Sequence, residues 1–144
     1  MHLSYADSSF DLVITSETLE HVPDVDAALG EIHRVLKPAG LHVFTVPVVW
    51  DRAKSRRRAY LDNGKLVHVL PPSYHGAPQH NKTDLLVFYE FGADFVEQCR
   101  RVGFDVSVVR DEKNPALVAF IARKGQGVGL SPGPRSACPA GPGD

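Results

Sequence analysis

Two stretches of this 144-residue chain predict an α/β fold built on a doubly wound, mainly parallel sheet. Phe10–Pro47 combines an apolar run, a helical periodicity and a second apolar run, which together indicate a βαβ unit with a right-handed crossover. Near the other end, Phe104–Arg110 and Leu117–Arg123 are apolar runs joined across Asp111–Pro115, a length typical of hairpins. We therefore expect parallel strands followed by an antiparallel pair.

The first predicted strand is Phe10–Ser16. Its residues are apolar almost without interruption, as expected of a parallel strand that is covered on both faces. The loop Glu17–Asp24 follows and leads into a helix.

A helix is predicted over Val25–Lys37, with Asp24 as its amino-terminal cap. Its apolar residues recur with helical spacing and form one stripe: Val25, Ala28, Leu29, Ile32 and Leu36. Pro38 cannot continue a helix, and Gly40 permits the exit of the chain. A second buried strand is then expected over Leu41–Pro47.

A β-hairpin is predicted after this unit, because Asn63-Gly64 lies between Ala59–Leu61 and Lys65–Leu70. A basic run precedes it: Lys54, Arg56, Arg57 and Arg58. Such a run could bind phosphate, but the balanced charge of the chain favours a solvated face.

The loop Pro71–Thr83 adds two histidines to His68, so that three fall within thirteen residues: His68, His75 and His80. Their spacing fits no standard ligand pattern, and no cysteine or acid completes the set. We therefore predict no metal site here. Tyr74 and His75 fit a loop that contacts a polar substrate, or a plain surface loop.

A second helix is expected to begin near Gly92 and to end at Gly103, with Phe95, Cys99 and Val102 on its apolar face. Beyond it lie the two strands of the antiparallel pair. Glycine, proline and serine dominate from residue 125 onward. We expect one domain over residues 1–124 and a disordered tail over residues 125–144.

Composition narrows the possible partners and location of the chain. The net charge is -1, which gives no field to attract nucleic acid or anionic lipid. No apolar run approaches the ~20 residues of a membrane helix, and Met1–Tyr5 lacks the features of a signal peptide. Cys99 and Cys138 are too few for a disulfide framework. We expect a cytoplasmic protein with reduced thiols.

Polar residues gather directly after the first strand, where open α/β sheets bind their ligands. They are Ser16, Glu17, Glu20 and His21. Two carboxylates and an imidazole could bind a polar ligand, and Glu20 or His21 could act as a base. The same residues could instead cap the following helix, and the sequence leaves both interpretations open.

Three short motifs are similar to those of class I S-adenosylmethionine-dependent methyltransferases, and most closely to the type 11 branch. They are Phe10-Asp11-Leu12-Val13, Leu19-Glu20-His21-Val22 and Arg34–Leu41. The later Phe88–Gly92 and Val102-Gly103-Phe104 also fit that branch, so the resemblance covers roughly residues 4–124. It implies a Rossmann-like sheet in which Phe10–Thr15 is the fourth strand and Leu41–Val46 the fifth.

The resemblance also implies a function and a site. The chain would transfer methyl groups from S-adenosylmethionine to a small-molecule or glycan-type acceptor. Ser16 and Glu17 would line the cofactor pocket, with His21 nearby. The hairpin and the Tyr74-His75 loop would lie over the acceptor, and His21 and His75 are the candidates for a general base.

Several family features have no counterpart in this chain. They are the Gly-rich loop that follows the first of the family's seven strands, the acid that binds the ribose and the acid that reaches the adenine. Ala39 also stands where the family often has glycine. We expect a truncated form whose first strand exposes an open edge, and which forms a homodimer, pairs with a complementing amino-terminal half or folds marginally. The alternative function is a non-catalytic partner subunit or remnant that does not bind cofactor alone.

Overall fold

The computed structural model describes residues 2–75, 85–114 and 118–125. Its elements in chain order are β1 (Phe10–Ser16), η1 (Leu19–His21), α1 (Val25–Val35), β2 (Leu36–Thr45), β3 (Arg56–Arg57), β4 (Ala59–Asp62), β5 (Lys65–His68), β6 (Tyr89–Glu90), α2 (Phe95–Arg101), β7 (Phe104–Arg110) and β8 (Val118–Lys124). The expected tail from residue 126 to the carboxyl terminus lies outside the described residues.

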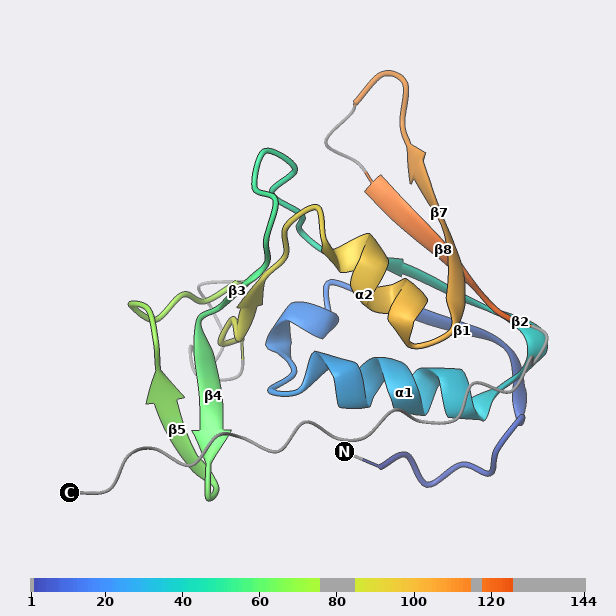
Figure 1. Ribbon diagram of the computed structural model, residues 1–144, viewed down its shortest axis with the longest axis horizontal. Coiled ribbons are helices and arrows are strands. Elements are labelled where there is room, and N and C mark those ends of the chain that lie inside the picture. Colours follow the sequence, from blue (N-terminus) through green and yellow to red (C-terminus); the bar gives the residue numbers. More distant parts are fainter. Residues whose placement is uncertain (1, 76–84, 115–117, 126–144) are drawn as a thin grey trace.

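The main sheet has four strands in the order β1-β2-β8-β7 (Figure 1). β1 and β2 run parallel, and α1 connects them, which confirms the predicted βαβ unit. β7 and β8 pair antiparallel over their whole length, which confirms the predicted final pair. The sequence did not indicate that β8 lies between β2 and β7, antiparallel to both. The fold class is therefore α/β with a mixed sheet.

Both helices pack against the same face of this sheet. The buried cluster joins α1, α2 and alternate residues of the strands: Val25, Ala28, Leu29 and Ile32 from α1, Phe95 and Cys99 from α2, and Leu36, Phe44, Phe104, Val106, Phe120 and Ala122 from the strands. The rings of Phe44 and Phe120 stack on neighbouring strands with centroids 5.0 Å apart. The thiol of Cys99 is buried and free, as its place on the predicted apolar face implied.

The helix α1 begins as predicted, because the Asp24 side chain accepts a hydrogen bond from the Ala27 amide at 3.0 Å. It ends at Val35 rather than at Lys37, and β2 starts directly with Leu36. A residue before proline is disfavoured in the helical region, which explains why Lys37 is extended instead. The Lys124 side chain donates to the carbonyls of His33 and Leu36, both at 2.7 Å, and so ties β8 to the end of this helix.

A bulge interrupts the pairing of β1 with β2. Phe10 is opposite Leu36, whereas Leu12 is opposite Leu41, so the intervening residues of β2 have no regular partners. Ala39 takes up the irregularity with φ = 62°, in the left-handed region. The strand predicted over Leu41–Pro47 is thus longer at its start and ends at Thr45.

The prediction that β1 is covered on both faces is wrong for the part of the chain that the structure describes. Val13 packs against the core, but Leu12 and Ile14 point to the other face and are 47% and 68% exposed. They continue an apolar row through their neighbours Leu41 and Val43 on β2. The edge position of β1 in the described sheet agrees with the expectation of an open strand edge.

The β-hairpin is confirmed by β4 and β5, whose turn residues Asn63 and Gly64 both have positive φ (47° and 77°). It projects away from the main sheet, at the left of Figure 1. The short pair β3–β6 at its base was not predicted. No described helix has the length and apolar character to cross a bilayer.

We predict that Ala39→Gly raises the free energy of unfolding by about 0.5–1 kcal/mol, because glycine adopts a left-handed backbone without the steric penalty of a Cβ. The neighbouring change Gly40→Ala is the matched contrast. A Cβ there would lie 2.9 Å from the Lys37 carbonyl oxygen and 3.2 Å from that of Asp11. It should cost about 1–3 kcal/mol. Urea denaturation measures the change in the free energy of unfolding for both variants. If both variants stabilise the chain, or both destabilise it, the backbone conformation assigned to Ala39 and Gly40 is contradicted.

A second prediction concerns the imidazole of His42, which is fully buried and stacks on Phe44. Burial lowers its pKa to about 4. Below its ordinary pKa the unfolded chain binds a proton at this ring that the folded chain excludes, so stability falls as the pH falls from about 6.5 towards 4. Relative to His42→Leu, the wild type should lose up to about 3 kcal/mol over this range. If the free energies of unfolding of the wild type and of His42→Leu change in parallel with pH, the lowered pKa of His42 is refuted.

Candidate functional site

A cleft lies at the carboxyl ends of β1 and β2, where an α/β sheet is expected to bind ligands. Its volume is about 1370 Å³. The walls come from the ends of β1 and β2, the segment after β2, and the adjoining ends of β7 and β8: Ser16, Glu17, Thr45, Val46, Pro47, Val48, Val49, Trp50, Val109, Arg110, Asp111, Glu112, Lys113, Val118 and Ala119. Two of the predicted cofactor residues, Ser16 and Glu17, therefore line one cleft.

The backbone at Glu17 is held in an uncommon conformation. Its φ is 47°, in the left-handed region, while its amide donates to the Thr45 carbonyl at 3.0 Å. The hydroxyls of Ser16 and Thr45 share a hydrogen bond of 3.0 Å across the two strand ends. Strained backbone at the end of a strand is common at ligand sites, where it aims a side chain that regular structure would not.

The far wall of the cleft includes a cation stacked on an aromatic ring. Arg110 lies over the indole of Trp50, with 4.4 Å between the guanidinium carbon and the ring centroid. This contact was not foreseen, because its two side chains are sixty residues apart in sequence and meet only through the β7–β8 hairpin. The cleft thus combines an apolar lining with the Glu17 carboxylate at the end of β1 and, on the other wall, side chains of both charges: Arg110, Asp111, Glu112 and Lys113.

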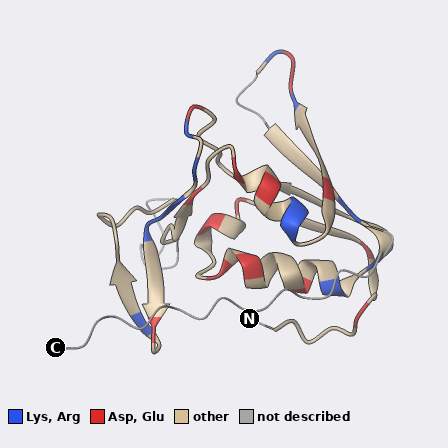
Figure 2. Cartoon of the chain, viewed as in Figure 1, with Lys and Arg blue, Asp and Glu red and all other residues tan. Residues whose placement is uncertain are grey.

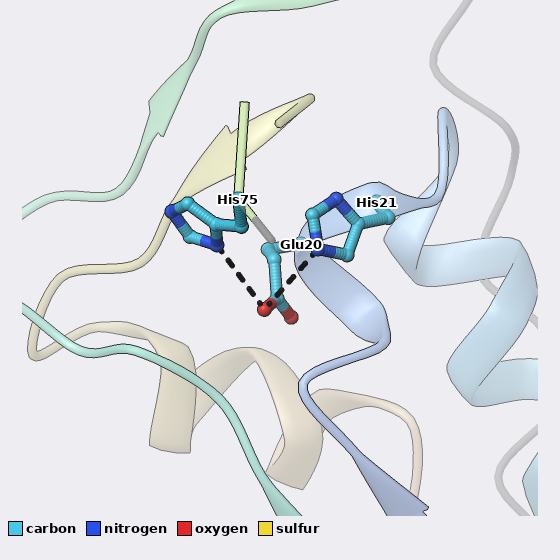
Figure 3. A group of neighbouring side chains, drawn as sticks. All are labelled: Glu20, His21 and His75. Atoms are coloured by element: carbon cyan, nitrogen blue, oxygen red, sulfur yellow. Dashed lines mark ion pairs between the residues drawn. The ribbon is translucent and has the colours of Figure 1, made fainter. Parts of the chain in front are cut away.

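A second polar group lies beside η1 (Figure 3). Glu20 and His21 belong to η1, and His75 comes from the segment after the hairpin. The nearest nitrogens of both imidazoles lie 3.6 Å from Oε1 of Glu20. The two rings meet edge to face with centroids 5.4 Å apart. His21 and His75, the predicted base candidates, are therefore neighbours in space.

The carboxylate of Glu20 is fully buried. Neither of its oxygens accepts a hydrogen bond within the described part of the chain. Burial raises the pKa of Glu20 above its ordinary value, and the Glu17 carboxylate adds to this, while its own backbone amide and the two imidazoles oppose it. A buried carboxylate that lies beside two imidazoles and accepts no well-formed hydrogen bond is unusual in a structural core and marks a candidate site.

Members of the basic run before the hairpin, drawn in blue in Figure 2, have structural partners. Arg58 pairs with the Glu90 carboxylate, as does Arg52, which precedes the run. Burial alone would raise the pKa of Glu90, but these two guanidinium groups hold it below its ordinary value. Arg57 donates to the Tyr89 hydroxyl at 2.9 Å and lies over that ring. These contacts hold β3 against β6 and give Arg57 and Arg58 a structural role.

The structure separates the histidines that the sequence grouped together. His68 ends β5 and is exposed, and His80 lies outside the described residues. His75 instead meets Glu20 and His21, which precede it by more than fifty residues. Sequence spacing could not reveal this group, because the contact depends on how the segment after the hairpin folds back.

Comparison with known proteins gives a consistent relationship. Residues 1–44 match the family model described as a methyltransferase domain. The chain is 58% identical over 40 residues to demethylmenaquinone methyltransferase of Lactobacillus johnsonii. The matched stretch covers 28% of this chain and 16% of that protein. It is 50% identical over 40 residues to methyltransferase GfsG of Streptomyces halstedii, covering 28% and 14% respectively.

The similarity in fold reaches beyond the matched stretch. A solved S-adenosylmethionine-dependent methyltransferase from Mesorhizobium loti superposes with a TM-score of 0.54 and 21% identity. The superposition covers 86% of this chain and 65% of that one. The chain thus shares the fold over nearly all of its length, but spans less than two thirds of these relatives.

Proposed function

We propose that the chain belongs to the class I S-adenosylmethionine-dependent methyltransferases of the type 11 branch and takes part in methyl transfer from S-adenosylmethionine. The observation that carries the proposal is the cleft at the carboxyl ends of β1 and β2, lined by Ser16 and Glu17. Its acceptor would be a small molecule or a glycan-type compound.

The chemistry of the cleft suits one part of this cofactor. S-Adenosylmethionine carries a positive sulfonium and an ammonium group, and the carboxylate of Glu17 is a favourable neighbour for either. Ser16 and Thr45 offer hydroxyls that can donate to or accept from polar atoms. The apolar residues of β2 and of the segment after it supply a wall that excludes water.

Methyl transfer requires an acceptor atom aligned with the sulfonium methyl group, and positioning supplies much of the rate. When the acceptor is a hydroxyl or an amine, a base assists by removing its proton. His21 and His75 are the candidates for this role, because their rings meet beside the buried Glu20 carboxylate.

We further propose that a complementing amino-terminal segment covers β1. Leu12 and Ile14 leave an apolar face open beside a strand whose outer edge is unpaired in the described sheet. Such a surface favours strand addition. The relatives contain residues that this chain does not match, and a segment of that kind could supply the Gly-rich loop that the resemblance implies for the cofactor.

The alternative function is that of a non-catalytic partner subunit or remnant. It is favoured by the same open face of β1, since a sheet without the cofactor loop can be stable and yet bind no nucleoside. Cofactor binding by the full chain separates the two functions.

We predict that S-adenosylhomocysteine binds the full chain weakly, at millimolar concentration, and shifts the amide resonances of Ser16, Glu17 and Thr45 in an NMR titration. Glu17→Gln should weaken this binding at least threefold, because it removes the negative charge that faces the cofactor. Asp62→Asn, at the tip of the hairpin, is the matched control and should leave it unchanged. A folded chain without shifts at these positions would favour the non-catalytic alternative.

We also predict that the lone chain self-associates through the open face when no complementing segment is supplied. Light scattering after size exclusion should give a mass that rises with concentration. Ile14→Lys should shift the population to monomer, because it places a charge on the apolar row. Val69→Lys, at a site of similar exposure (55%) after β5, is the control and should not. A compact monomer at all concentrations would overturn the proposed surface.

A further inference from the structure

We propose that Glu20, His21 and His75 bind a divalent transition-metal ion of the zinc class. Each residue offers one donor atom, and these atoms lie within 4.8 Å of one another. Two imidazoles and one carboxylate form the donor set of many catalytic metal sites, in which a fourth position stays open for water or substrate.

Two of the three donor separations suit an ion as they stand, and the third lies within 4.8 Å. Bonds of about 2.0–2.1 Å in a tetrahedral site place the donor atoms about 3.4 Å apart. The separations from Glu20 Oε1 to His21 Nε2 and to His75 Nδ1 are both 3.6 Å. They are too long for hydrogen bonds and close to what two ligands of one ion require.

The orientation of His21 is already that of a ligand. Its Nδ1 lies 2.9 Å from the Leu86 carbonyl oxygen, which can only accept, so Nδ1 carries the proton in the neutral ring. The lone pair of Nε2 then faces Glu20, as Figure 3 shows. Ligand histidines commonly donate their other N–H to a backbone carbonyl, which fixes the ring.

One short segment positions all three residues. Phe88 donates its amide to the Glu20 carbonyl at 2.7 Å, and Leu85 accepts from the His75 amide at 3.0 Å. Leu86, which holds the His21 ring, lies between them and pairs with Tyr74 in a β-bridge. Backbone hydrogen bonds therefore bring the three residues together, and the Leu86 carbonyl also orients the His21 ring.

The buried carboxylate gives an independent reason for the site. Glu20 is fully buried, and both of its oxygens lack a hydrogen bond among the described residues. A desolvated carboxylate without donors is costly, and a coordinated cation would satisfy it. His75, 41% exposed at its side chain, leaves the group accessible from solvent, so an ion could enter.

The site differs from the histidine group that the sequence suggested. That group lacked an acid and had no ligand spacing, whereas the folded chain adds Glu20 and replaces His68 by His21. A bound ion would occupy the imidazole lone pairs and so replace the general base, and it could instead coordinate an oxygen of the acceptor, a role that rests on the proposed methyl transfer. Binding of the ion itself does not depend on that function.

The test is titration of the full chain, without cofactor, with Zn²⁺ by calorimetry and with Co²⁺ by visible absorption. We expect one ion per chain and d–d bands in the intensity range of four- or five-coordinate cobalt. His75→Ala and Glu20→Gln should each weaken binding at least tenfold. His68→Ala removes an exposed histidine outside the group and should change nothing.

Circular dichroism of each variant shows whether it folds, and His75→Ala remains informative because its side chain lies at the surface. Equal affinity of His75→Ala and wild type, or an equal loss in His68→Ala, would overturn the site and indicate adventitious binding by surface histidines. A chain that binds the ion but not S-adenosylhomocysteine would retain the site while favouring the non-catalytic alternative to the proposed methyl transfer.

Discussion

The hydrogen bonding of β2 along both of its edges is the constraint on which the rest of the structure depends. β2 pairs parallel with β1 on one side and antiparallel with β8 on the other. This arrangement brings the end of β1, the end of β2 and the start of β8 to one edge of the sheet, where the cleft forms. The same strand directs His42 and Phe44 into the layer beneath the helices.

Over the described residues, helices cover one face of the sheet, and the other face is exposed at β1. The covered face carries two helices and a stacked aromatic core, which is enough to hold the strands in register. The open face presents Leu12 and Ile14 at the edge strand. Ser16 and Glu17 follow directly on this partly exposed edge strand and line the cleft, so the cleft adjoins the uncovered part of the sheet. Cofactor binding and the covering of β1 are therefore linked in the proposed function.

Glu20 lies close in sequence to one polar region and belongs to the other. Glu17, three residues earlier, lines the cleft, whereas Glu20 itself faces His21 and His75. A buried carboxylate without hydrogen bonds destabilises a fold unless something compensates its charge. A proton shared with the imidazoles would compensate this charge, and so would a bound cation. In the first case the group could take up the proton of the acceptor, and in the second the ion could coordinate the acceptor oxygen.

The sequence by itself determined the local elements: strand β1, the cap at Asp24, the Asn63-Gly64 turn and the antiparallel final pair. These follow from periodicity, capping and turn chemistry, which act over a few residues. Only the tertiary structure decided that β8 enters beside β2, that Arg110 covers Trp50, and that His75 meets Glu20. Such contacts depend on which surfaces pack together across fifty or more residues, and no local pattern encodes that choice.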